Sequence, residues 1–117
     1  MIKRNGSFKT EIRERMREGA GSAKIEHLWL PKEELGASSM RLCAKVVLEP
    51  GCGIGDHPHD KEEEVYFILK GEAEFEESGV KTILKPGDTT LTGNGASHSI
   101  KCHGNKTLEF MAIVTSF

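Results

Sequence analysis

Residues 51–71 read GCGIGDHPHDKEEEVYFILKG, and this stretch is the most informative part of the chain. His57 and His59 are two residues apart, so on an extended backbone both imidazoles leave the same face, about 6 to 7 Å from each other. Pro58 favours the extended conformation, because a residue that precedes proline is disfavoured in the helical region. The sequence therefore predicts that both imidazoles can reach one metal ion.

The second half of this stretch supplies a carboxylate. Residues 65–69 form a compact apolar run rich in β-forming side chains, and the run ends at Gly71. The polar residues 60–63 are typical of a turn. If the apolar run folds back antiparallel over this turn, Glu64 lies beside His59.

A third imidazole follows in residues 87–98, GDTTLTGNGASH, which end at His98. Three imidazoles and one carboxylate form a mixed nitrogen and oxygen donor set that suits Mn, Fe, Co, Ni, Cu or Zn. Glu63 competes with Glu64 for the carboxylate position, and the six-residue step from Glu64 to Gly71 favours Glu64. We interpret Glu62 and Glu63 as a solvated charge run.

The rest of the chain predicts a β protein. Glycine and proline turns separate several short segments of β-forming residues, and residues 2–21 are expected to be helical or irregular. This pattern favours an antiparallel sandwich or barrel, which would bring His98 to the other three candidate ligands when it closes. The expected strands cover residues 25–30, 40–49, 72–76, 80–84, 89–92, 97–102 and 108–114.

The spacing of glycine, two histidines, glutamate and glycine in residues 51–71 resembles the first motif of the cupin superfamily. Residues 86–98 resemble the second motif, although Gly93 stands in place of a proline and Cys102 in place of an asparagine. The resemblance runs from about residue 40 to about residue 115. It implies an antiparallel jelly-roll barrel, or double-stranded β-helix, and a metal site whose ligands are His57, His59, Glu64 and His98.

A length of 117 residues fits one domain, with an N-terminal arm at about 1–39 and a barrel at about 40–117. The resemblance implies a homodimer that exchanges or packs N-terminal strands. Trp29, with Leu28 and Leu30, is the candidate contact. The alternative is that Trp29 covers the core of its own barrel. His27 lies outside both motifs, and we interpret it as a surface or dimer-contact residue.

Composition excludes several classes of protein. The net charge is -2, with 16 basic and 18 acidic residues, which argues against a nucleic-acid partner. No apolar stretch approaches the roughly 20 residues that span a bilayer, and no signal-peptide core is present, so we expect a cytoplasmic protein without a membrane partner. Three cysteines without a CxxC pair suit a reducing compartment. Cys102 shares strand parity with His98 and could face the same cavity.

Two functions from different classes fit these features. Four protein ligands leave two positions of a six-coordinate metal open, which catalysis requires. The resemblance implies a small metalloenzyme, such as a dioxygenase, an oxalate-degrading enzyme or an isomerase, acting on a small polar substrate. Tyr66 is a weak candidate for a proton donor, as is Lys70. The alternatives are a metal-dependent module that binds a sugar or carboxylate without turnover, and a structural barrel with a vestigial site.

Overall fold

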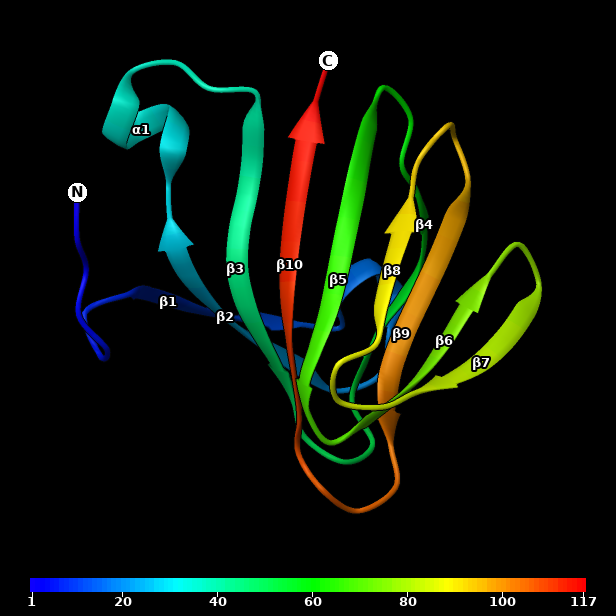
Figure 1. The fold of residues 1–117 in the computed structure, drawn as a ribbon. Helices are drawn as coiled ribbons and strands as arrows, with labels where there is room; N and C mark the ends of the chain where they lie inside the picture. Colours follow the sequence, from blue (N-terminus) through cyan, green and yellow to red (C-terminus); the bar gives the residue numbers. More distant parts are fainter.

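Two antiparallel sheets face each other in the computed structural model, which describes residues 1–117 (Figure 1). The six-stranded sheet contains, in spatial order, β1 (Lys9–Glu14), β2 (Ser22–Trp29), β3 (Met40–Leu48), β10 (Leu108–Ser116), β5 (Glu62–Lys70) and β8 (Thr89–Thr92). The four-stranded sheet contains β4 (Gly53–Pro58), β9 (Ser97–His103), β6 (Glu72–Glu77) and β7 (Val80–Leu84). A short 3₁₀ turn, η1 (Met16–Glu18), and a one-turn helix, α1 (Pro31–Leu35), complete the chain.

The core lies between the two sheets and follows from the alternation of side chains along each strand. In β3 the buried side chains are Ala44, Val46 and Leu48, which occupy every second position as the sequence predicts. A cluster of 14 buried hydrophobic residues draws on both sheets. Between the sheets the core also holds buried polar side chains in place of apolar ones, namely His57, His59, Glu64, Thr92 and His98.

The antiparallel jelly-roll fold predicted from the sequence is confirmed, and the expected strands from residue 40 onward are all present. The expectation for residues 2–21 is wrong in part, because β1 pairs with β2 in regular antiparallel register. The helix α1 was also not predicted. Its first residue is Pro31, a position where the missing backbone donor costs nothing.

The expected hairpin between the strands that carry His57 and Glu64 is not formed. β4 pairs with β9 in the four-stranded sheet, whereas β5 pairs with β10 and β8 in the six-stranded sheet. The chain therefore crosses from one sheet to the other between these strands. Glu64 reaches His59 from the opposite sheet, and not from a neighbouring strand.

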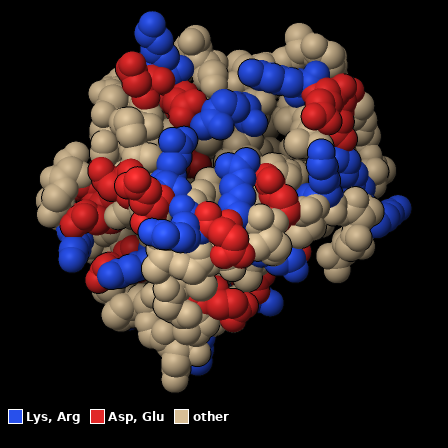
Figure 2. All heavy atoms as spheres, turned by 180° about the vertical axis from the view of Figure 1, so that it is seen from behind, with Lys and Arg blue, Asp and Glu red and all other residues tan.

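None of the helices is long and apolar enough to cross a membrane. On the face drawn in Figure 2, acidic and basic side chains are interspersed, and neither sign forms a continuous field. This distribution agrees with the small net charge of the chain.

Candidate metal centre

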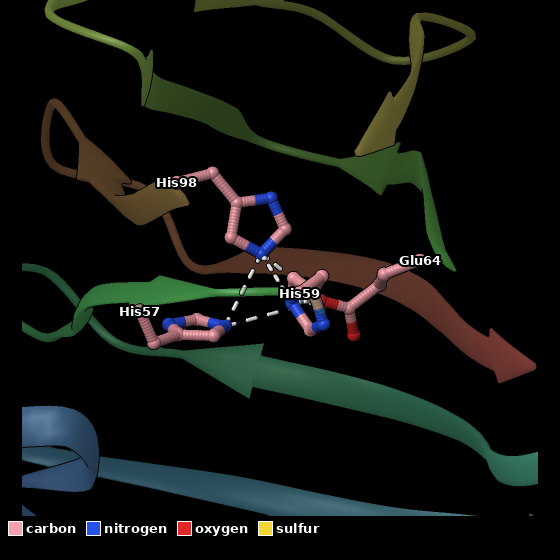
Figure 3. A group of neighbouring side chains, drawn as sticks. All are labelled: His57, His59, Glu64 and His98. Carbon is pink, nitrogen blue, oxygen red and sulfur yellow. Dashed lines mark hydrogen bonds and ion pairs between the residues drawn. The ribbon is translucent and has the colours of Figure 1, made fainter. Parts of the chain in front are cut away.

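The two sheets together bring the four candidate ligands to one place. His57 on β4 lies directly opposite His98 on β9 in the strand register. His59 follows β4, and its backbone N–H donates to the carbonyl of Ala96, just before β9. Glu64 faces them from β5. All four side chains are buried, and Figure 3 shows the three imidazoles and the carboxylate pointing toward one another.

The donor atoms of this four-residue cluster are closely spaced. The Nε2 atom of His98 lies 3.0 Å from that of His59 and 3.2 Å from that of His57. Oε1 of Glu64 lies 2.8 Å from Nε2 of His59, 3.0 Å from Nε2 of His98 and 4.0 Å from Nε2 of His57. The ring centroids of the three imidazoles are 4.7 to 4.9 Å apart, so the rings surround a common centre almost evenly.

Each imidazole is oriented by a contact at its other nitrogen. The Nδ1 atom lies 2.7 Å from the Gly55 carbonyl in His57, 2.7 Å from Oε1 of Glu62 in His59, and 2.9 Å from Oγ1 of Thr92 in His98. A carbonyl and a carboxylate can only accept, and the hydroxyl proton of Thr92 is directed to Glu77, 2.7 Å away. Each neutral imidazole therefore donates its Nδ1–H outward and presents the Nε2 lone pair to the centre.

These separations test whether a metal ion fits. Ligands of a six-coordinate ion with bonds of about 2.1 Å lie about 3.0 Å from their neighbours and about 4.2 Å from the ligand opposite. Four of the donor separations, 2.8 to 3.2 Å, match the first value, and the donor atoms of all four residues lie within 4.8 Å of one another. The 4.0 Å between His57 and Glu64 matches the second. Oε1 of Glu64 is also buried without a hydrogen bond of good geometry, as expected of an oxygen whose partner is a cation.

The electrostatics of the cluster favour an ionised carboxylate. Burial by itself opposes ionisation of Glu64, but the imidazoles of His57, His59 and His98 hold the pKa of this carboxyl well below its ordinary range. The Glu64 carboxylate in turn raises the pKa of His59; burial lowers this pKa and Glu62 raises it, and the net shift is upward. A proton and a metal ion therefore compete for Nε2 of His59.

A cavity of about 80 Å³ opens from the cluster, and apolar side chains from both sheets form much of its wall. Three arginines also line this cavity. Arg41 makes a two-pronged contact with Glu62 at 2.9 and 3.0 Å, and Arg13 lies 3.2 Å from Glu11. Arg17 on η1 has no side-chain partner, so its guanidinium is free to meet an anion at the cavity mouth.

The two candidate proton donors, Tyr66 and Lys70, lie in different environments. Tyr66 is buried against the cluster, with its ring stacked on His98 at a centroid distance of 4.9 Å. Burial and the neighbouring Glu64 charge raise the pKa of Tyr66, so its hydroxyl keeps its proton. The expectation for Lys70 is wrong, because its side chain is 74% exposed and lies near Glu109. A β-bulge in the pairing of β10 with β5 breaks the alternation before Lys70.

Other expectations also need correction. Glu62 is not merely solvated, because its carboxylate joins His59 to Arg41. The spacing of three residues between His59 and Glu62 was the sequence feature that could have predicted their contact. Glu63 is exposed, as predicted. His27 is half-buried and contacts Glu11 at 2.8 Å within its own chain, and its role as a dimer contact stays a prediction.

The alternative that Trp29 covers the barrel core is not supported, because Trp29 is absent from the core cluster. It lines a surface hollow beside α1, together with Met1, Leu35 and Met40. The ammonium of Lys3 lies 4.8 Å from the centre of the Trp29 ring.

The family follows from comparison with known proteins. The model of the cupin domain family matches residues 44–114. The chain is a cupin. The two departures from the cupin motifs lie outside the four-residue cluster. Gly93 directly follows β8, and Cys102 is buried in the core, where its thiol donates to the carbonyl of Lys106 at 3.0 Å. Cys102 does not line the site cavity, because four residues of strand place it about 13 Å along β9 from His98.

This cupin is 40% identical over 114 residues to a Thermotoga maritima protein named "Oxalate-binding protein", covering 97% of this chain and 93% of the relative. It is also similar to a crystal structure described as a "predicted oxalate decarboxylase" from Thermotoga maritima, with 36% identity, a TM-score of 0.92 and complete coverage of both chains. The structure of KdgF from Halomonas sp. shares the fold, with a TM-score of 0.73 at 15% identity over 97% of this chain and 93% of that one.

Proposed function

We propose that this cupin binds one divalent transition-metal ion, and that the ion holds a small carboxylate-bearing molecule of about the size of oxalate. The ligands in this proposal are Nε2 of His57, His59 and His98 and Oε1 of Glu64. The observation that carries the proposal is the convergence of three oriented lone pairs and one orphaned carboxylate oxygen at the spacing of metal ligands. Mn, Fe, Co, Ni, Cu and Zn all suit this donor set.

The number and arrangement of the donors support a ligand with two oxygens. A six-coordinate ion held by these donors would have His57 and Glu64, 4.0 Å apart, on opposite sides, and His59 and His98, 3.0 Å apart, as neighbours. The two remaining positions of a six-coordinate ion are then neighbours as well. Two oxygens of one small dicarboxylate can occupy such a pair of positions.

The cavity supports a ligand that is small and anionic. A space of about 80 Å³ admits a molecule of a few heavy atoms. Arg17 is the cavity-lining arginine without a side-chain partner, and a guanidinium pairs well with a carboxylate. The names of the two Thermotoga relatives, an oxalate-binding protein and a predicted oxalate decarboxylase, agree with this ligand class.

Turnover of the bound carboxylate is a second candidate function, and Tyr66 favours it. When bound, a divalent ion supplies Lewis acidity to the site, and a redox-active ion supplies electron transfer as well. Tyr66 keeps the proton on its buried hydroxyl near Glu64, so this hydroxyl can donate a hydrogen bond to an oxygen of a bound carboxylate. Apolar residues such as Leu42 and Phe110 exclude water around a bound molecule.

Calorimetric titration of the Mn(II)-loaded protein with oxalate tests the proposal. We expect saturable binding that is lost in His98→Ala, because the metal is lost, and weakened in Arg17→Gln, which keeps the metal. Acetate, which has one carboxylate, and glucose, which has none, serve as control ligands. Equal binding of oxalate to the metal-free protein would contradict a metal-held ligand. The mass of the recovered ligand, followed with oxygen uptake, separates turnover from binding.

A further inference from the structure

A buried chain of hydrogen bonds leaves the four-residue cluster on the side of His98. Nδ1 of His98 lies 2.9 Å from Oγ1 of Thr92, and Oγ1 of Thr92 lies 2.7 Å from Oε1 of Glu77. His98 is fully buried and Thr92 is 1% exposed, so water cannot replace the contact between these two residues. Glu77 is half-buried and lines a surface hollow.

The direction of each hydrogen bond in this chain follows from the donors available. A carboxylate oxygen accepts, so the single hydroxyl proton of Thr92 is donated to Glu77. The lone pairs that remain on Oγ1 can only accept from Nδ1–H of His98. Glu77 therefore determines, through Thr92, that the Nε2 atom of His98 carries the lone pair that faces the metal centre.

The strand register gives the same contact a second consequence. Thr92 on β8 lies opposite Glu64 in the six-stranded sheet, and Glu77 on β6 lies opposite His98 in the four-stranded sheet. The hydrogen bond between Thr92 and Glu77 thus joins the two sheets at the level of two candidate ligands, one from each sheet. The four cluster residues contact one another across the two sheets. Outside that cluster, the His98–Thr92–Glu77 chain contains the only side-chain hydrogen bonds between strands of opposite sheets.

We propose that Thr92 and Glu77 are positioning residues that set the tautomer of His98 and the His98–Glu64 separation, and thereby the metal affinity of the centre. This inference rests on the proposed metal-binding function. Partners that orient a metal-bound imidazole commonly change metal affinity by about 10- to 100-fold when they are removed. Thr92 and Glu77 act through His98 and do not touch the ion themselves.

Metal competition against a chromogenic chelator tests the proposal in three variants. Thr92→Val keeps the branched shape and removes the hydroxyl, and we expect affinity for Mn(II) or Zn(II) to fall by about 10- to 100-fold. Thr92→Ser keeps the hydroxyl and should stay within about 3-fold of the wild type. Glu77→Leu should resemble Thr92→Val, whereas Glu76→Gln, on the opposite face of β6, should not differ from the wild type.

Nitrogen-15 NMR of the metal-free protein at alkaline pH provides a readout that a merely structural role would not move. We expect His98 to be protonated on Nδ1 alone in the wild type and in Thr92→Ser, and to be a mixture of tautomers in Thr92→Val. This measurement needs no metal, so it tests the positioning role even if the wild type binds none and the proposed function fails. Unchanged affinity and an unchanged tautomer in folded Thr92→Val would overturn the inference, as would equal losses in the Ser and Val variants.

Discussion

Each of the three clustered imidazoles is oriented by a different kind of acceptor: a backbone carbonyl for His57, a carboxylate for His59 and a hydroxyl for His98. Because these partners come from different parts of the chain, each ligand can be disturbed separately. Backbone carbonyls cannot be removed by substitution, so His59 and His98 offer the clearer tests. Glu62, the partner of His59, is the residue that we interpreted from the sequence as part of a solvated charge run.

At this scale, Glu62→Gln should weaken metal binding by about 10-fold or more, because the amide oxygen is a weaker acceptor for Nδ1–H of His59 than a carboxylate. Glu63→Gln is the matched control, since Glu63 is the exposed neighbour on the other face of β5. Chelator competition measures both. Equal affinities for the two variants would show that the contact between Glu62 and His59 does not support the metal centre.

The raised pKa of His59 predicts how metal retention depends on pH. Protonation of Nε2 excludes the metal, so metal affinity should begin to fall once pH drops below the raised pKa of His59, and bound metal should be lost at still lower pH because it competes with the proton. In the metal-free protein the sign is opposite. The stability that protonated His59 contributes is fully present below 6.5 and is lost as pH rises through the raised pKa.

Metal content after dialysis at a series of pH values, together with thermal unfolding of the metal-free protein, measures these two trends. His59→Gln should remove the pH dependence of the metal-free stability in this window. Metal retention that stays constant from about pH 8 to about pH 4.5 would show that imidazoles are not the donors.

At the element scale, glycines hold η1 against β4. A side chain at Gly55 would collide with the backbone carbonyl of Arg17, and one at Gly19 would collide with the carbonyl of Gly53. The backbone carbonyl of Gly55 also accepts the hydrogen bond from Nδ1–H of His57. The contact between η1 and β4 therefore couples the position of Arg17, which lines the cavity, to the orientation of His57.

Gly55→Ala should destabilise the protein by about 1 to 3 kcal/mol, because an added methyl group in a tightly packed contact forces backbone shifts. It should also weaken oxalate binding, since η1 and Arg17 are displaced. Gly93→Ala is the milder comparison, because its added carbon would lie 3.3 Å from Cβ of Glu63, whereas a carbon at Gly55 would overlap the Arg17 carbonyl oxygen. Thermal unfolding and calorimetric titration measure the two effects, and a Gly55→Ala protein that matches Gly93→Ala in both would contradict the coupling.

The strands from β3 to β10 could be predicted because apolar alternation and glycine or proline turns mark their ends. β1 could not, because residues 9–14, KTEIRE, contain one apolar side chain and lie at the edge of the sheet. The positions of His57, His59, Glu64 and His98 were available from motif spacing. The contact of Thr92 with His98 and Glu77 was not, since it depends on which sheet each strand joins.

At the scale of the whole molecule, the edge strand β1 and the hollow around Trp29 bear on the predicted homodimer. Ile12 on β1 is 57% exposed and Leu35 on α1 is 66% exposed, so apolar side chains lie on this side of the chain. An unpaired edge strand with nearby apolar surface is a common place for a second copy to pack.

Sedimentation velocity measures this prediction. We expect a homodimer for the wild type and a shift toward monomer for Trp29→Ala or Ile12→Lys. Val80→Lys is the matched control, because Val80 is an exposed apolar residue at the far edge of the other sheet. A wild-type protein that sediments as a monomer at every concentration would contradict the predicted homodimer.

The central claim is that four residues from two sheets form one metal centre, and the metal content of purified protein tests it most directly. Wild type and His103→Ala, an exposed histidine at the end of β9, should each carry about one equivalent of transition metal after exhaustive dialysis. His98→Ala, altered on the same strand, should carry almost none while keeping its fold. Metal that stays with His98→Ala, or that is lost from His103→Ala, would contradict the assignment.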